Sequence, residues 1–172
     1  TPVNPNPIVP IHLNMLPTSK LVLWDRGAPF DTVFGGTDGR PYLWDVNAGT
    51  FTLAPWPGYD LFCVGHGLMA DGRLFVPGGH IADGVGEIKA SIYDPVSNLW
   101  TRLPDMNAGR WYPTVTTLGN GDLLVEGGTV DIATDVNKTS QIWRIADSSW
   151  LNLTNAAAQH GVFPAWEIGR AH

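Results

Sequence analysis

A repeat of about fifty residues is the feature that most constrains how this chain can fold. The stretches 68–79 and 118–128 each run from an apolar strand through a turn glycine to a glycine doublet. The turn glycines, Gly72 and Gly121, lie 49 residues apart, and the doublets repeat with the same spacing. A turn glycine between two apolar runs predicts a hairpin, here with a type I′ turn. The doublets are expected where the backbone turns sharply or passes close to another segment.

The second half of each unit repeats as well. The stretches 43–51, 92–100 and 142–150 each contain an apolar strand, a polar turn and an aromatic residue that opens the next strand. A unit of about fifty residues with four short strands is typical of a kelch propeller blade. The predicted blades cover about 11–57, 58–107 and 108–155.

The composition agrees with this fold class. Gly and Pro together account for 34 of 172 residues, and only 15% of residues are charged, which favours short strands and tight turns over a helical bundle. A single β-sandwich is the alternative, but it does not explain why turns and doublets recur in register. We therefore predict an all-β fold, a partial kelch-type β-propeller of about three and a half four-stranded blades.

Such a structure is expected to be part of a longer protein. A propeller closes with four to eight blades, so three blades leave two large faces uncovered. Residues 1–10 are predicted to be an extended, Pro-rich lead-in rather than folded core, and 163–166 to begin a fourth blade. Residues 167–172 are predicted to be a non-native tail.

Charge and motifs exclude several functions. The net charge is −6 and no run of Lys or Arg occurs, which argues against a nucleic-acid partner. No apolar stretch approaches the roughly 20 residues of a membrane helix. The single cysteine, Cys63, excludes an intrachain disulfide. The five histidines have no metal-ligand spacing among themselves, and phosphate-loop and serine-nucleophile motifs are absent.

Two residues stand out because they share the blade period. Cys63 and Tyr112 are 49 residues apart, so we expect them at equivalent positions on the first strands of adjacent blades. First strands line the central axis of a propeller, where residues one blade apart can approach each other. Taken singly, a lone Cys or a Tyr after a Trp is more commonly a packed core residue.

These residues lie in stretches that resemble a known family. The stretches 60–66, 71–80, 93–95 and 105–114 resemble the copper radical oxidases, the group of galactose oxidase and glyoxal oxidase, over about 12–155. The pair Phe62-Cys63 combined with Arg110-Trp111-Tyr112-Pro113 is closer to the glyoxal oxidase branch. The resemblance implies a seven-bladed ring and a secreted, extracellular protein.

The resemblance also implies a cofactor. In that family the residues that match Cys63 and Tyr112 are joined by a thioether bond, and the Tyr is both copper ligand and radical site. The implied reaction oxidises a primary alcohol or aldehyde with O2 and produces H2O2. Phe62 is expected to pack near the site, although ordinary core packing explains it equally well, and His66 and His80 are expected to be structural.

The same resemblance shows what the chain lacks. The family's second, axial Tyr with its following His ligand, another His ligand, the later blades and the C-terminal domain are absent, so the chain alone is expected to be inactive. The alternative function is a non-enzymatic kelch interaction module. A sugar-binding module is less favoured, because the aromatic residues recur at the blade period, as core residues do. Asn137 and Asn152 head two sequons for N-glycosylation.

Overall fold

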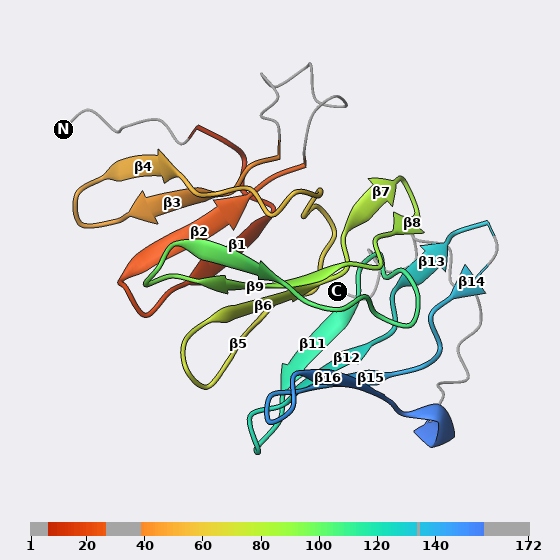
Figure 1. Cartoon of the computed structure of the whole chain (residues 1–172). Coiled ribbons are helices and arrows are strands. Elements are labelled where there is room, and N and C mark those ends of the chain that lie inside the picture. The colour runs from red at the N-terminus through yellow and green to blue at the C-terminus, as the bar shows by residue number, and fades with distance from the viewer. Residues whose placement is uncertain (1–6, 27–38, 134, 157–172) are drawn as a thin grey trace.

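The computed structural model describes residues 7–26, 39–133 and 135–156, which form short strands, turns and a single 3₁₀ helix, η1 (Thr154–Ala156). Most strands belong to three antiparallel sheets of four strands each, coloured red to orange, yellow to green, and cyan to blue (Figure 1). The first sheet holds β1 (His12–Met15), β2 (Lys20–Trp24), β3 (Tyr42–Asp45) and β4 (Thr50–Leu53). The second holds β5 (Gly67–Leu68), β6 (Leu74–Pro77), β9 (Ala90–Asp94) and β10 (Leu99–Arg102). The third holds β11 (Thr114–Thr117), β12 (Leu123–Glu126), β15 (Gln141–Arg144) and β16 (Ser149–Asn152).

Each sheet is a propeller blade with its strands in order, which confirms the predicted all-β, partial kelch propeller. The first strands of the second and third blades lie next to each other, and the Thr117 hydroxyl on β11 donates a 2.7 Å hydrogen bond to the Leu68 carbonyl on β5. Just before these strands, Tyr112 N–H donates to the Cys63 carbonyl at 2.8 Å, so the entrances to the two strands also lie close together, and the candidate site forms there.

The hairpin turns differ from the predicted type I′. Only Gly72 is left-handed (φ 85°), whereas a type I′ turn would need Asp71 to be left-handed too. Gly72 N–H donates to the Met69 carbonyl at 2.9 Å, so an ordinary turn is followed by one left-handed residue. Gly121 (φ 91°) repeats this geometry, and Ser19 (φ 61°) takes the same place in the first blade. Because this loop is one residue longer than a type I′ hairpin loop, a single left-handed residue is enough to close it.

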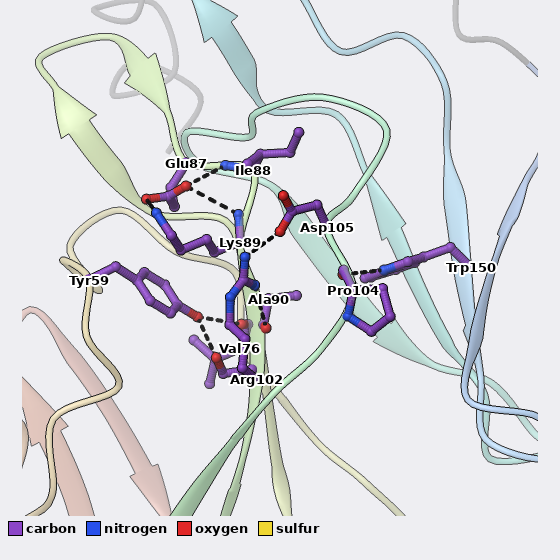
Figure 2. A network of polar contacts seen from close by, with 11 residues as sticks. Tyr59, Val76, Glu87, Ile88, Lys89, Ala90, Arg102, Pro104, Asp105 and Trp150 are labelled. Atoms are coloured by element: carbon purple, nitrogen blue, oxygen red, sulfur yellow. Dashed lines mark hydrogen bonds and ion pairs between the residues drawn. The ribbon is translucent and has the colours of Figure 1, made fainter.

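The aromatic residue that opens the fourth strand ties each blade to the one before it. The Trp150 indole N–H donates to the Pro104 carbonyl at 2.8 Å, as Figure 2 shows, and Trp100 donates to the Pro55 carbonyl at the same distance. A Trp can place its large ring in the blade interface and still satisfy its N–H there. The aromatic repeat in the sequence therefore marks the joints between blades.

Two of the three buried clusters in the described residues lie between blades. One buried cluster joins the first and second blades through residues such as Trp24, Leu61 and Tyr93, and another joins the second and third through Phe75 and Trp143. A third cluster lies at the first blade, where Ile8 packs with Leu21 and Leu23. The prediction that 1–10 is not folded core is therefore wrong for Ile8, which is buried because the first blade leaves an apolar face beside it.

A small fourth sheet was not predicted from the sequence. It contains β7 (His80–Ala82), β8 (Val85–Gly86), β13 (Thr129–Asp131) and β14 (Asp135–Val136), and lies beside the blades in Figure 1. Each hairpin is an insertion between the second and third strands of its blade, and the two pair across the blade boundary through Asp131 and Val85. These strands have two or three residues each, too few for a periodic pattern to reveal them.

Several predicted features lie outside the described residues, namely residues 1–6 of the lead-in, the start of a fourth blade at 163–166 and the tail at 167–172. In the part of the chain that the structure describes, no helix is long and apolar enough to cross a membrane.

Gly86 is the residue on which the junction between the second and third blades depends. A Cβ there would lie 2.3 Å from the Thr129 carbonyl oxygen and 2.5 Å from the backbone nitrogens of Arg110 and Trp111. These neighbours are backbone and cannot rotate away, so Gly86→Ala should lower the free energy of unfolding by about 1–3 kcal/mol or more. Urea unfolding measures this loss. The control is Gly119→Ala, where nothing lies within 4 Å; equal effects of the two substitutions would contradict the prediction.

Candidate functional site

Cys63 and Tyr112 lie at equivalent positions but not on the first strands themselves. Cys63 lies in the turn that precedes β5, and Tyr112 in the bend that precedes β11. Both residues have a left-handed backbone with φ 58°, which a β-strand cannot contain. Cys63 and Tyr112 therefore occupy equivalent positions in their blades, but these positions lie just before the first strands and not on them.

This backbone conformation is unusual for residues with a side chain. Five non-glycine residues in the described part of the chain have positive φ, and three of them occupy the turn of a blade hairpin: Ser19, Asn98 and Ser148. The other two are Cys63 and Tyr112. A left-handed residue with a Cβ costs about 1–2 kcal/mol, and such strain gathers at functional sites where surrounding contacts enforce it.

The contacts that enforce it are backbone hydrogen bonds from three directions. Arg110 N–H donates to the Glu87 carbonyl (3.0 Å), Trp111 N–H to the Thr129 carbonyl (2.9 Å) and Tyr112 N–H to the Cys63 carbonyl (2.8 Å). The acceptors belong to the inserted hairpin of the second blade, the inserted hairpin of the third blade and the Cys63 turn. Consecutive residues are thus fixed to three separate segments, which determines where the Tyr112 ring points.

The carboxylate of Glu87 secures the first of these segments. It is buried, accepts hydrogen bonds from the backbone N–H groups of Ile88 (2.9 Å) and Lys89 (3.3 Å), and pairs with the Lys89 ammonium at 2.6 Å (Figure 2). A buried carboxylate needs this many donors to offset the loss of water. The Glu87 carbonyl is therefore a rigid acceptor for Arg110.

The Cys63 and Tyr112 side chains are neighbours. Their backbones are joined by the 2.8 Å hydrogen bond, and the side chains lie close enough to shift each other's pKa. Burial raises the pKa of the Cys63 thiol to about 12, and burial with the neighbouring sulfur raises the pKa of Tyr112 to about 12. Both groups are therefore protonated at neutral pH. Cys63 is fully buried, whereas the Tyr112 residue is 44% exposed, so this pair can be reached only from the phenol side.

Aromatic rings surround the pair. The Trp111 ring lies edge-to-face with the Tyr112 ring, with centroids 4.6 Å apart. Its indole also lies near the Cys63 sulfur, where it lowers the pKa of the thiol slightly, although its N–H makes no well-formed hydrogen bond within the described residues. Phe62, the predicted neighbour of the site, is buried beside Cys63, with the His80 ring edge-on at 5.4 Å.

An ion pair lies near the exposed side of the phenol. Arg26 and Asp83 form a 2.6 Å salt bridge, and the Arg26 guanidinium also lies 5.2 Å from the centre of the Phe62 ring. Their effects on Tyr112 oppose each other, since Arg26 lowers the pKa of the phenol and Asp83 raises it. Arg26 and Asp83 therefore make the surroundings of Tyr112 more polar, while their effects on its pKa oppose each other.

The side chain of Arg110 anchors the segment 110–112 in the third blade. Its side chain is fully buried and donates to the carbonyls of Gly127 and Thr139, each at 2.6 Å, and to the side-chain oxygens of Asn107 (3.1 Å) and Gln141 (3.3 Å). Burial lowers the pKa of the guanidinium to about 10, so it stays charged at neutral pH. Removing a buried cation of this kind would leave several acceptors unsatisfied.

The same network accounts for Asn137, one of the two predicted glycosylation residues. Asn137 is only 5% exposed, and its amide exchanges two hydrogen bonds with the Asn107 amide, at 3.0 and 3.1 Å. A glycan on this nitrogen would break the pair and force the blade apart. The structure therefore argues against Asn137 as a glycan carrier, whereas Asn152 lies exposed on β16.

Sequence reasoning missed His12. Its Nε2 accepts a 3.1 Å hydrogen bond from Cys63 N–H, so the first blade also contributes to the site. His12 and Cys63 are 51 residues apart, outside the 49-residue register, and no local motif marks the contact. His66 lies in the same cluster, with its ring centre 5.3 Å from that of His12, and not beside His80.

No group of three or more His, Cys, Asp or Glu side chains that could hold a metal comes together among residues 7–26, 39–133 and 135–156. What this chain can offer to a metal at the site is the half-exposed phenol oxygen of Tyr112 beside the buried sulfur. That donor suits copper as a phenolate, and further ligands would have to come from other segments.

The chain is similar to several known proteins. The Kelch motif family matches residues 69–107. A galactose oxidase of Gibberella zeae is 30% identical over 159 residues, which covers 87% of this chain and 22% of that protein. A solved fungal alcohol oxidase of the AA5 family, in complex with copper, has a TM-score of 0.69 and 29% identity, and covers 92% of this chain and 34% of the other. An F-box/kelch-repeat protein of Arabidopsis thaliana is 29% identical over 97 residues, 56% of this chain.

Fold and site together define a kelch-type propeller segment with a strained Cys–Tyr pair at a blade junction. Since galactose oxidase and the AA5 alcohol oxidase match nearly the whole described region, the chain belongs to the kelch propellers of the copper radical oxidase family. It spans 22% of the galactose oxidase and 34% of the alcohol oxidase that it matches.

The difference between the two sequons gives a direct test. After expression through a eukaryotic secretory pathway, we expect a glycan at Asn152 and none at Asn137, because only Asn152 is exposed. Glycopeptide mass spectrometry identifies the occupied residue. Asn152→Gln should remove the endoglycosidase-sensitive gel shift while Asn137→Gln leaves it unchanged. Folded protein that carries a glycan on Asn137 would contradict the expectation.

The buried imidazole of His12 makes stability depend on pH. Burial, with repulsion from His66, lowers the pKa of His12 from 6.5 to about 4. The unfolded chain therefore binds a proton more readily, and stability present above pH 6.5 is lost as pH falls towards 4. The loss should reach about 2–3 kcal/mol.

Urea unfolding of the copper-free protein at pH 7 and pH 4.5 measures this loss. His12→Gln removes the titrating group and should make the difference between the two pH values clearly smaller. Burial also lowers the pKa of His66, which acts in the same direction and remains in both proteins. Equal losses in the wild type and the variant would show that His12 does not titrate as expected.

Proposed function

We propose that this chain is the N-terminal part of a copper radical oxidase in which Cys63 and Tyr112 form a thioether cofactor. The observation that carries the proposal is the shared left-handed backbone of two residues one blade apart, which a backbone hydrogen bond from Tyr112 N–H to the Cys63 carbonyl holds together. The family membership supports the same assignment. The proposed reaction oxidises a primary alcohol or an aldehyde with O2 and yields H2O2.

Formation of the cofactor is an oxidation that this geometry favours. The S–H bond of Cys63 and one C–H bond ortho to the Tyr112 hydroxyl break, and a carbon–sulfur bond forms between them. Two protons and two electrons are lost, and O2 accepts both to become H2O2, so atoms and electrons balance. Because a 2.8 Å backbone hydrogen bond holds the Cys63 turn against Tyr112, much of the entropic cost of bringing the two groups together is already met in the fold.

Copper, when bound, would supply one-electron chemistry at a phenolate ligand, and Tyr112 is the residue of this chain that would hold it. Loss of the Tyr112 proton is required first, and its raised pKa means that a free phenolate is rare at neutral pH without a cation beside it. A sulfur substituent donates electron density to the ring and makes the phenol easier to oxidise. The buried Cys63 and the Trp111 ring cover part of this ring, and the rest of Tyr112 stays exposed.

The remaining parts of the enzyme are proposed to lie in segments beyond this chain. They would provide the other copper ligands, the later blades and the C-terminal domain, so the chain alone is proposed to be inactive. A small alcohol or aldehyde and O2 are the proposed partners, with no role for nucleic acid or a membrane. Secretion follows from the proposed family role.

A non-enzymatic kelch interaction module remains the second candidate. The Arabidopsis F-box/kelch-repeat relative and the Kelch motif match favour it, since both concern the repeat and not the site. An interaction module, however, gives no reason for a Cys and a Tyr to occupy positions where glycine would be unstrained.

The test uses the complete protein, purified without copper and then exposed to copper and O2. We expect a peptide map to show Cys63 joined to Tyr112 with the loss of two hydrogens, and peroxide production from simple alcohols or aldehydes. Cys63→Ser and Tyr112→Phe should each abolish the linked peptide and reduce peroxide production by at least about a hundredfold.

The matched control is Tyr42→Phe, which removes a phenol hydroxyl from β3 in the first blade. This variant should link Cys63 to Tyr112 and produce peroxide at the wild-type rate. A free thiol at Cys63 after loading of the wild type, together with no peroxide, would refute the oxidase and favour the interaction module.

A further inference from the structure

The Cys63 turn is held from the first blade by a side chain that the proposed chemistry does not use. Cys63 N–H donates a 3.1 Å hydrogen bond to Nε2 of His12, which is buried at the start of β1. The carbonyl of Cys63 accepts the N–H of Tyr112 at 2.8 Å. Both backbone groups of the strained Cys63 are therefore paired, one with the first blade and one with the third.

His12 is itself fixed in place. Its ring stacks on the Trp24 ring, with centroids 5.2 Å apart and planes 19° from parallel, because the two residues face each other in the β1–β2 register. The Trp24 indole N–H donates to the Leu61 carbonyl at 2.8 Å. The first blade thus holds the turn at Leu61 and at Cys63, through the stacked rings of Trp24 and His12.

The hydrogen bond requires an acceptor on Nε2, so the imidazole must be neutral with its proton on Nδ1. Burial beside His66 lowers the pKa of His12 to about 4, so the imidazole is neutral at neutral pH. His66 belongs to the cluster but differs in its contacts, since its Nδ1 lies 3.0 Å from the Asn14 amide nitrogen.

We propose that His12 is a positioning residue for the Cys63–Tyr112 pair, acting through its hydrogen bond to Cys63 N–H. It holds Cys63 in the left-handed conformation, and among the described residues it makes no hydrogen bond or ring contact with Tyr112. The inference rests on the proposed cross-link for its consequence, although the hydrogen bond itself can be tested without it.

Substitution by Gln or Asn separates this role from packing. A Gln side chain places its amide oxygen near the position of Nε2, whereas the shorter Asn side chain reaches only the position of Nδ1. Both are polar, uncharged and smaller than His. A packing role would be lost in both variants, whereas an acceptor role is rescued by Gln alone.

The experiment uses the complete protein with His12→Gln, His12→Asn and His12→Ala, and His66→Gln as the control from the same cluster. The first readout is the rate at which a small alkylating reagent modifies Cys63 in the folded, copper-free protein. We expect His12→Asn and His12→Ala to react about tenfold faster than the wild type, the effect of losing one hydrogen bond, with His12→Gln and His66→Gln within about threefold of it.

The second readout is the rate of thioether formation after addition of copper under air, followed by peptide mapping. His12→Asn and His12→Ala should link about tenfold more slowly than His12→Gln. Equal alkylation and linking rates in the Gln and Asn variants would overturn the role of His12. If the wild type never links but the alkylation rates still separate Gln from Asn, the proposed oxidase fails and the positioning of Cys63 by His12 stands.

Discussion

The three consecutive backbone hydrogen bonds of 110–112 are the interactions on which the site depends. They tie one short segment to both inserted hairpins and to the Cys63 turn. Glycines in the neighbouring segments leave room for this close backbone packing. A Cβ on Gly78 would lie 2.4 Å from the Arg110 carbonyl oxygen, and one on Gly79 would lie 2.5 Å from that of Asp60. The glycine doublet therefore builds the blade and also makes room for the segment that carries Tyr112.

The repeat allowed the blades, the glycine doublets and the equivalent positions of Cys63 and Tyr112 to be predicted, because all of these follow from one period. What the sequence could not reveal depends on contacts outside that period. The strands of the fourth sheet are too short to show alternation, and His12 reaches Cys63 from a position that is out of register. The burial of Asn137 depends on Asn107, thirty residues earlier, and no local pattern marks that pair.

Two predictions were wrong for the same physical reason. The type I′ turn and the placement of Cys63 and Tyr112 on strands both assumed regular backbone where the chain uses a single left-handed residue. In the hairpins that residue is Gly72, Gly121 or Ser19, where solvent and a short side chain make the conformation easy to adopt. At the site it is a Cys and a Tyr, and the conformation persists only because neighbouring segments hold both of them.

This contrast separates the scaffold from the site. A propeller blade needs left-handed residues at its hairpin turns, and Gly, Asn and Ser serve there at little cost. Nothing in blade packing calls for the same conformation at a buried Cys and a half-exposed Tyr, since glycine would fit the backbone without strain. Keeping these two side chains costs stability, which His12, Glu87 and the buried Arg110 network offset by fixing the surrounding backbone. Strain of this kind gathers at functional sites, and here it holds a thiol beside a phenol, which is what the proposed thioether cofactor would require.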